Sequence, residues 1–470
     1  MTPFDTIIAG GTIATSSDTF RADIGIRDGR IAALGLDLGD AAETIDASGL
    51  LVLPGGIDSH VHISQPSGEG VTMADDFESA TRSAAFGGMT TLLPFCLQAK
   101  GQGLRDAVSW YHGLAEGNCY TDVSFHLIVT DPTPQTLNQD LPALVEDGYT
   151  SLKVFMTYEG MKLTDREILD TLEAAKACGA LPMVHAENDD AIEYLRDRAA
   201  DQGDTAPKFH ASTRPIPAER EATHRAIALA EIVDVPIMIV HVSNGDAISE
   251  IEAGRARGSV VHAETCPQYL VLTADDLDTA GFDGAKYVCS PPPRDTDSQI
   301  ACWSGIERGV FDVFSSDHCP FRYDDAEGKK HPQGLRSFRW VPNGIPGVET
   351  SLPILFSEGV GKGRIDLNRF VALSSTNHAK MYGLYPRKGT IAVGSDADIV
   401  LWDPNRSEVL RQEILHHGAD YTPYEGIAVT GWPVHTMLRG KTIVADGELR
   451  ADKGVGAYQR RARSGEALTV

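Results

Sequence analysis

The residues of this chain that most clearly could do chemistry are two closely spaced histidines. His60 and His62 follow an apolar run at 50–53 and stand two positions apart. Side chains two apart on a strand share one face, so both imidazoles are expected to point the same way. Paired imidazoles suit a divalent metal such as zinc. Alone the pair is weak evidence, because chance supplies about half an HxH pattern in a chain of 470 residues with 15 histidines.

Other ligand-type residues stand in or just after further apolar, strand-like runs. They are Lys153, His185, His241 and Asp317. With the paired histidines, five separate runs each bring such a residue to or near a carboxyl end. In a (β/α) barrel the active site lies at that end of the strands. The recurrence favours one metal site at a barrel mouth over unrelated structural residues.

Lys153 is the unexpected member of this set, because an ammonium group repels metal ions. A lysine buried near cations has a lowered pKa and can be neutral. A neutral amine can add carbon dioxide to form a carbamate, whose two oxygens can bridge two metals. The alternative is an ordinary lysine at a strand end whose ammonium reaches solvent.

The elements that must position these residues are of two kinds. Residues 4–53 and about 390–447 are short β-like runs with Asp-Gly turns, a hairpin signal, and we expect the two ends to meet in one small β-sandwich. Between them, strand-like runs alternate with helical stretches at 74–86, 165–178, 218–232 and 245–257. This alternation favours a TIM-like parallel (β/α)8 barrel. A doubly wound open sheet is the alternative, but no Gly-rich dinucleotide motif follows an early strand.

The predicted organisation has three parts. Residues 1–53 and 381–447 form the β-sandwich, and residues 54–380 form the metal-dependent barrel. Residues 448–470 form a C-terminal tail, interpreted as an arm or a partly disordered segment that could contact another subunit.

Composition narrows the class of protein. Of 470 residues, 42% are hydrophobic and 23% are charged, which is ordinary for a globular protein. The formal net charge of -25 argues against a basic surface that binds nucleic acid or an anionic membrane. The first residues lack the features of a secretory signal, and no run approaches the length of a membrane span. Seven cysteines without a CxxC pair indicate reduced thiols, so we expect a cytoplasmic protein.

Motifs spread over nearly the whole chain resemble the dihydropyrimidinases and hydantoinases of the amidohydrolase superfamily. They lie at 54–62, 151–158, 183–188, 241–243, 264–270, 286–292, 316–321, 342–349 and 395–404. The resemblance implies a (β/α)8 barrel with a terminal β-sandwich and two divalent metal ions, expected to be zinc. By this resemblance His60, His62 and Asp317 bind the first metal, and His185 and His241 bind the second.

The resemblance also implies roles for the rest of the site. Lys153 would be N6-carboxylysine, the bridge between the metals, and the Tyr158 hydroxyl would donate a hydrogen bond to the developing oxyanion. Ser290 and Asn343 match positions whose main chain binds the cyclic imide. Asp317 would carry a proton from a metal-bound hydroxide to the departing ring nitrogen. The implied enzyme is a hydrolase that opens a dihydropyrimidine or 5-substituted hydantoin to an N-carbamoyl amino acid.

Other functions remain open beside this one. Dihydroorotases place an arginine shortly after the paired histidines, whereas residues 63–66 contain none. Allantoinase, or another cyclic-imide hydrolase, is harder to separate, although the pattern from Lys153 to Tyr158 favours a hydantoinase. A non-catalytic scaffold of the collapsin-response-mediator type shares the fold without the metal ligands, whereas all six ligand positions are filled here. His262 and His318 are interpreted as structural, and Cys319 as a packing residue.

Substrate specificity is predicted from residues near the site. Many hydantoinases that accept aromatic rings carry bulky apolar residues after the paired histidines and after the catalytic tyrosine. Here Gln65, Ser67 and Lys162 would make that wall polar and partly cationic, which would attract a ring with a polar or anionic side chain. The alternative is that Lys162 points to solvent, so that Phe155 or Met161 forms an apolar wall.

The expected partners are a small cyclic ureide or imide and further copies of the chain. Relatives in this family are usually tetramers, and closed symmetric assemblies are common among enzymes. We therefore expect a homo-oligomer, namely a tetramer, with the segment after Gly447 at an interface. No nucleic-acid or membrane partner is expected.

Overall fold

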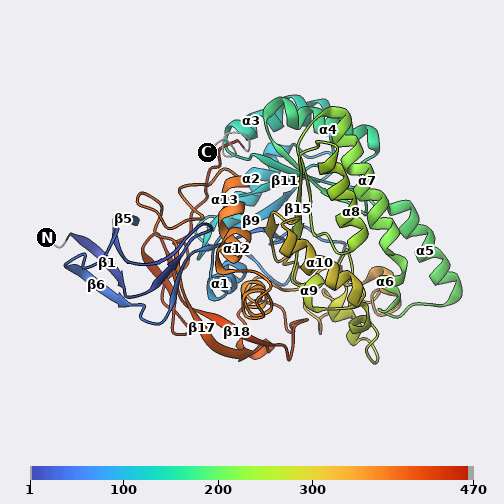
Figure 1. The fold of residues 1–470 in the computed structure, drawn as a ribbon. Helices are drawn as coiled ribbons and strands as arrows, with labels where there is room; N and C mark the ends of the chain where they lie inside the picture. Colours follow the sequence, from blue (N-terminus) through green and yellow to red (C-terminus); the bar gives the residue numbers. More distant parts are fainter. Residues whose placement is uncertain (1–2, 464–470) are drawn as a thin grey trace.

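The structure is a computed structural model that describes residues 3–463, in which a barrel is flanked by two β-sheets (Figure 1). Both sheets lie to one side of the molecule: one contains β1, β5 and β6, and the other contains β17 and β18. Helices α4, α7 and α8 lie on the other side.

Eight parallel strands form the barrel. They are β8 (Gly56–Val61), β9 (Met89–Leu97), β11 (His126–Ile128), β12 (Ser151–Phe155), β13 (Leu181–His185), β14 (Ile237–Ile239), β15 (Val261–Thr265) and β16 (Val313–Phe314), and the short β10 (Asp122–Val123) also pairs with β9. A bridge between Val61 and His318, with a 2.7 Å hydrogen bond from the His62 N–H to the His318 carbonyl, joins the first strand to the segment after the last. The sheet closes on itself there, so the predicted (β/α)8 barrel is confirmed.

Helices cover the outside of the barrel, and α4 (Asp165–Cys178) shows how the sequence sets their ends. The Thr164 side chain accepts the Glu167 N–H while the Glu167 carboxylate accepts the Thr164 N–H, and Gly179 ends the helix at φ 77°. This helix coincides with the predicted stretch 165–178. The other main helices are α1 (Phe77–Phe86), α2 (Leu104–Ala115), α3 (Leu141–Glu146), α5 (Asp189–Gln202), α7 (Ile216–Val233), α8 (Gly245–Ala256) and α10 (Thr296–Arg308). The predicted helical stretches at 74–86, 218–232 and 245–257 correspond to α1, α7 and α8.

Both chain ends contribute to the larger flanking sheet. Its order is β20-β19-β18-β17-β7-β2-β3, with bounds β2 (Thr12–Ala14), β3 (Thr19–Arg21), β7 (Leu51–Pro54), β17 (Ile399–Val409), β18 (Ala428–Leu438), β19 (Lys441–Ala445) and β20 (Glu448–Leu449). Strand β7 pairs antiparallel with β17, which joins the two ends directly.

The smaller sheet has the order β5-β4-β1-β6 and comes from the N-terminal region alone, with bounds β1 (Phe4–Ala9), β4 (Asp23–Arg27), β5 (Arg30–Gly35) and β6 (Ala41–Asp46). Asp28 and Gly29, at φ 52° and 75°, form the predicted two-residue turn between β4 and β5. Ile24 of this sheet shares one hydrophobic cluster with Ile399 and Met437 of the larger sheet. The sheets therefore pack face to face, and the prediction that the two chain ends meet in a β-sandwich is confirmed.

The chain after β20 returns to the barrel. The Tyr458 ring lies 5.2 Å from that of Phe125 and 5.3 Å from that of Tyr149, between ring centroids. Arg461 is buried and donates to the Ser151 hydroxyl at 2.7 Å. The described part of the tail is therefore packed against the barrel and is not the free arm that its composition suggested. Residues 464–470 of that tail lie outside the described residues.

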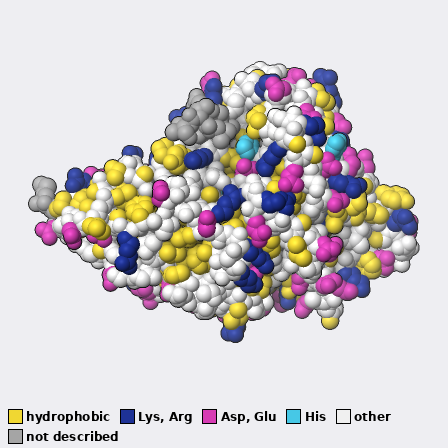
Figure 2. Space-filling view, viewed as in Figure 1, with side chains coloured by type: hydrophobic (Ala, Val, Ile, Leu, Met, Phe, Trp, Pro, Cys, Tyr) yellow, Lys and Arg dark blue, Asp and Glu magenta, His cyan; other side chains and the backbone are white. Residues whose placement is uncertain are grey.

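The surface mixes charges of both signs. Figure 2 shows Lys and Arg side chains interspersed with Asp and Glu over the face in view, so neither sign forms a continuous patch there. Within residues 3–463, no helix combines the length and the apolar character needed to cross a membrane.

Candidate metal centre

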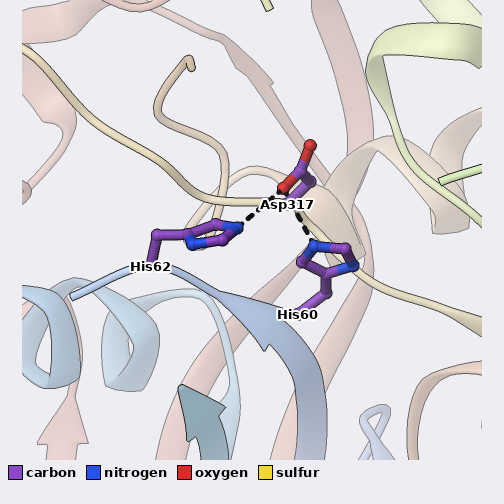
Figure 3. A group of neighbouring side chains, drawn as sticks. All are labelled: His60, His62 and Asp317. Carbon is purple, nitrogen blue, oxygen red and sulfur yellow. Dashed lines mark ion pairs between the residues drawn. The ribbon is translucent and has the colours of Figure 1, made fainter. Parts of the chain in front are cut away.

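Three predicted ligands converge at the mouth of the barrel (Figure 3). His60 lies near the end of β8, His62 follows that strand, and Asp317 follows β16. The Nε2 atoms of His60 and His62 lie 3.2 and 3.5 Å from Oδ1 of Asp317. Their ligand atoms all lie within 4.8 Å of one another. Two imidazole nitrogens and a carboxylate oxygen so placed are suitable donors for a divalent cation.

Lys153, His185 and His241 form a second group beside the first. The Nζ atom of Lys153 lies 2.9 Å from Nε2 of His60, and Nε2 of His241 lies 2.9 Å from Nδ1 of His185. All three side chains are buried, and they line the same cavity as His62 and Asp317. The structure therefore brings the six predicted ligands together, although they come from five different strand ends.

Two buried glutamates hold the outer nitrogens of the histidines. Nδ1 of His60 lies 2.6 Å from Oε1 of Glu264, and Nε2 of His185 lies 2.7 Å from Oε2 of Glu187. An acceptor at the outer nitrogen keeps the proton there and leaves the inner nitrogen free to bind a metal. Sequence reasoning assigned these glutamates no role. Both lie within the motifs that carry the family resemblance, but residue type alone does not say which ring each carboxylate faces.

Gln65 has a similar role at His62. Its Oε1 atom lies 2.6 Å from Nδ1 of His62, and its amide nitrogen donates to the Phe95 carbonyl at 2.8 Å. Gln65 lines the cavity, as predicted for a specificity residue, but both ends of its amide are already engaged. Its contacts therefore orient His62.

Three residues of the site adopt backbone conformations that are unfavourable for non-glycine residues. The φ angles are 41° at His241, 51° at Asp317 and 76° at Tyr158. Such residues cost about 1–3 kcal/mol each and cluster at functional sites. Each follows a barrel strand, so the sharp turn directs a ligand or a hydroxyl into the mouth.

Burial sets the protonation of the inner groups. Burial lowers the pKa of Lys153 to about 8. Burial and the charge of Lys153 hold the pKa of His60 well below its usual value, and burial together with His185 does the same for His241. Neutral imidazoles expose the lone pairs that a metal requires.

The cavity above these groups has a volume of about 900 Å³. The three residues predicted to contact substrate line it, namely Tyr158, Ser290 and Asn343. Three of the four predicted specificity residues line it as well, namely Gln65, Ser67 and Phe155. Burial raises the pKa of Tyr158 to about 12, and the Arg214 guanidinium, 5.2 Å from the ring centroid, opposes that shift. The Tyr158 hydroxyl therefore keeps its proton near neutral pH and can donate a hydrogen bond.

Lys162 lies outside the cavity wall. Its ammonium is 2.6 Å from Oδ2 of Asp189 and 3.0 Å from Oδ1 of Asp190, at the start of α5. The described residues that line the cavity include Phe155 and Met161 but not Lys162. The cationic wall predicted at this position does not form, because the two carboxylates hold the ammonium away from the cavity.

The two neighbouring histidines have the contacts expected of supporting residues, whereas the cysteine lies at the cavity. Nε2 of His318 lies 3.0 Å from Oδ2 of Asp75, and its Nδ1 accepts the Gly347 N–H at 3.1 Å. His262 lies 3.6 Å from Asp312. Cys319 was predicted to be a packing residue, but it also lines the cavity.

Comparison with known proteins finds relatives that match nearly the whole chain. The sequence model of the Amidohydrolase family matches residues 51–443. The chain is 47% identical over 458 residues to a D-hydantoinase of Rhizobium radiobacter, covering 97% of this chain and 99% of that one. It is 46% identical over 465 residues to a D-hydantoinase of Geobacillus stearothermophilus, covering 98% of each. Its fold superimposes with a TM-score of 0.95 on the dihydropyrimidinase from Brevibacillus agri NCHU1002, at 45% identity and 97% and 99% coverage.

Proposed function

The chain belongs to the hydantoinase and dihydropyrimidinase family of the amidohydrolase superfamily, and on that premise we propose that it opens a dihydropyrimidine or 5-substituted hydantoin ring. Membership makes it a hydrolase of cyclic amides. The proposed product is the N-carbamoyl amino acid. The observation that carries the proposal is the convergence of six ligand-type residues at the barrel mouth: five of them line the cavity that Tyr158 also lines, and His60 contacts Lys153 and Asp317 just beneath it.

The donor set fits two divalent cations. His60, His62 and Asp317 would hold one, and His185 and His241 would hold the other. The fit rests on the direction of the lone pairs. Because the Glu187 carboxylate accepts a hydrogen bond from the outer Nε2–H of His185, the inner Nδ1 of His185 presents a lone pair, 2.9 Å from Nε2 of His241. Zinc is the proposed metal, since imidazole and carboxylate donors suit it.

Lys153 is the proposed bridge, as N6-carboxylysine. Its Nζ lies 4.3 and 5.0 Å from the ring centroids of Phe95 and Phe155, and no carboxylate among the described residues forms an ion pair with it. An ammonium in that position would be buried with no carboxylate in ion-pair contact and would repel cations. Addition of carbon dioxide to the neutral amine, with loss of a proton, instead gives a carbamate with one negative charge and two oxygen donors.

The residues of the site then divide the chemistry. When bound, two divalent cations would supply the Lewis acidity that lowers the pKa of a water and polarises the ring carbonyl. Oδ1 of Asp317 faces His60 and His62. Its Oδ2 would accept the proton of the attacking water, and Asp317 would transfer that proton to the ring nitrogen as the C–N bond breaks. The carbonyl carbon gains the hydroxyl of that water. The Tyr158 hydroxyl donates a hydrogen bond to the charge that develops on the carbonyl oxygen.

Main-chain groups in the cavity suit a cyclic imide. Ser290 and Asn343 both line the cavity. Within residues 3–463, neither the Ser290 carbonyl nor the Asn343 N–H takes part in a hydrogen bond. An imide presents an N–H beside a carbonyl, which is the complement of this acceptor and donor. We propose that the pair selects ring amides of that kind.

A turnover panel with a metal count tests the proposal. Purified protein is assayed on dihydrouracil, hydantoin, allantoin and dihydroorotate, and its metal content is measured. Hydrolysis of dihydrouracil or hydantoin by protein with about two metals per chain is expected. Hydrolysis of allantoin alone would favour the allantoinase alternative, and protein with neither metal nor turnover would favour the scaffold.

We also propose that the chain assembles as a homotetramer, as closed symmetric enzymes commonly do. Light scattering at working concentration tests this proposal. A mass that stays at the 50.5 kDa of one chain would contradict it.

A further inference from the structure

A buried lysine links the two main-chain segments that line the substrate side of the cavity. Lys329 is 0% exposed, and its Nζ donates to the Val288 carbonyl at 2.8 Å and to the Pro342 carbonyl at 2.6 Å. The Val288 carbonyl also accepts the Gly344 N–H at 3.0 Å. Segments 288–290 and 342–344 are therefore tied to each other directly and through one side chain.

The surroundings of Lys329 are unusual for a buried lysine. Within the described residues no carboxylate pairs with it, and besides the two carbonyls its Nζ lies 5.9 Å from the Phe321 ring centroid. By contrast, the buried Lys388 has a carboxylate oxygen of Asp122 at 2.7 Å. Burying an unpaired cation is costly. A neutral amine, however, has two N–H groups, one for each of the two carbonyls to which Lys329 donates.

The bonded carbonyls determine the direction of the groups proposed to bind the ring. The Pro342 carbonyl and the Asn343 N–H belong to one planar peptide unit, so holding the carbonyl also orients the N–H. On the other segment, Lys329 holds the Val288 carbonyl, and Nε2 of His210 lies 2.8 Å from the Cys289 carbonyl. The carbonyl that follows is that of Ser290, which is free to face the cavity.

We propose that Lys329 is a positioning residue for substrate recognition, which sets the spacing and direction of the Ser290 carbonyl and the Asn343 N–H so that both meet one imide. This inference rests on the proposed function. It assigns Lys329 no contact with the reacting atoms. Its removal should therefore weaken recognition of the imide N–H and carbonyl and leave the metal ligands in place.

The test compares two inhibitors that differ only at the imide nitrogen. Succinimide and N-methylsuccinimide are measured as competitive inhibitors of hydantoin hydrolysis by the metal-loaded enzyme, because the methyl compound cannot donate to the Ser290 carbonyl. The variant is Lys329→Met, whose unbranched side chain is one atom shorter and has no hydrogen-bond donor. The matched control is Lys330→Met, whose ammonium lies 2.8 Å from Asp324 at the surface.

The expected result is a loss of preference. Wild-type enzyme and Lys330→Met should prefer succinimide. Lys329→Met should lose about ten-fold in succinimide affinity, because the contacts to both the imide N–H and the carbonyl are misdirected. N-methylsuccinimide has only the carbonyl contact to lose, so its affinity should fall less. Metal content should be unchanged. Equal losses of affinity for both inhibitors would indicate a merely structural role for Lys329 and would overturn the proposal. No loss of affinity for either inhibitor would also overturn it, as would a wild-type enzyme that does not prefer succinimide.

A second variant keeps the proposal open to refutation. If Lys329→Met does not fold, Lys329→Gln is measured instead, because its shorter amide can reach one carbonyl only. Its preference should fall below that of the wild type, and an unchanged preference would overturn the inference. A wild type that hydrolyses no cyclic ureide would refute the proposed function, whereas normal turnover with unchanged preference in the variants would refute only the role of Lys329.

Discussion

Oε1 of Glu264 lies 2.6 Å from Nδ1 of His60, and the side chains of both residues are fully buried. The same oxygen accepts the main-chain N–H of His241 at 3.1 Å. His60 belongs to one group of proposed ligands and His241 to the other. A single carboxylate therefore orients a ring in the first group and the backbone of the second.

Replacing Glu264 should weaken metal binding. Glu264→Gln keeps the volume but removes the charge that favours a proton on the outer nitrogen of His60. Metal affinity should fall about 10–100-fold, the range typical for partners of metal-bound histidines. Chelator titration of the loaded protein measures this change. Glu250→Gln, which alters a carboxylate that faces His224 on the outer surface, should behave like the wild type, and equal affinities in both variants would contradict the role of Glu264.

Lys153→Ala should lose most bound metal and most activity, because the carbamate supplies two of the proposed donor oxygens. Short carboxylic acids added to the variant should restore part of both. Metal analysis and hydantoin turnover measure the effect. Lys176→Ala is the matched control, since that ammonium lies 3.2 Å from Asp234 on the surface. Full metal content and normal turnover in Lys153→Ala would remove Lys153 from the centre.

Tyr158→Phe should lower kcat about 100–1000-fold, as loss of one donor to a developing oxyanion does. KM should change much less, because this hydrogen bond strengthens mainly in the transition state. Metal content should stay at the wild-type value. Steady-state kinetics on hydantoin decide the matter, and a variant that changes only KM would place Tyr158 in ground-state binding instead.

Lys162→Leu should leave the choice of ring substituent unchanged, because Asp189 and Asp190 hold the Lys162 ammonium away from the cavity. The ratio of kcat/KM for hydantoin-5-propionate and 5-phenylhydantoin is measured in wild type and variant. Equal ratios are expected. A large shift toward the phenyl compound in the variant would mean that the ammonium acts on the bound substituent.

The stability of the protein should depend on pH through Lys329. Burial lowers its pKa from 10.5 to about 7 in the folded chain. Between these values the unfolded chain binds more protons, so the contribution of Lys329 to stability rises with pH and is lost as pH falls toward 7. The free energy of unfolding of the wild type, relative to Lys329→Met, should therefore be larger at about pH 10 than at about pH 7. Urea unfolding measures both, and a difference that does not vary with pH would contradict the prediction.

Local sequence determined the elements and the kinds of ligand. The helix at 165–178 could be predicted to its ends because Thr164, Glu167 and Gly179 are capping residues whose effect is local. The grouping of His185, His241 and Asp317 could be predicted as well. Parallel barrel strands bring their carboxyl ends to one mouth, so residue type and position along each strand were sufficient.

Contacts between residues far apart in the chain were decided only by the tertiary structure. Glu264 is 204 residues from His60, and no local pattern says which ring it faces. The direction of Lys162 depended on Asp189 and Asp190 at the start of α5, which lies well beyond Lys162 in the chain. In the sequence Lys329 and Lys330 are two adjacent lysines that look alike. In the structure Lys329 is buried against main-chain carbonyls, whereas Lys330 faces Asp324 at the surface. A side chain several bonds long can reach in many directions, and the neighbours that select one direction are brought there by packing rather than by the sequence around it.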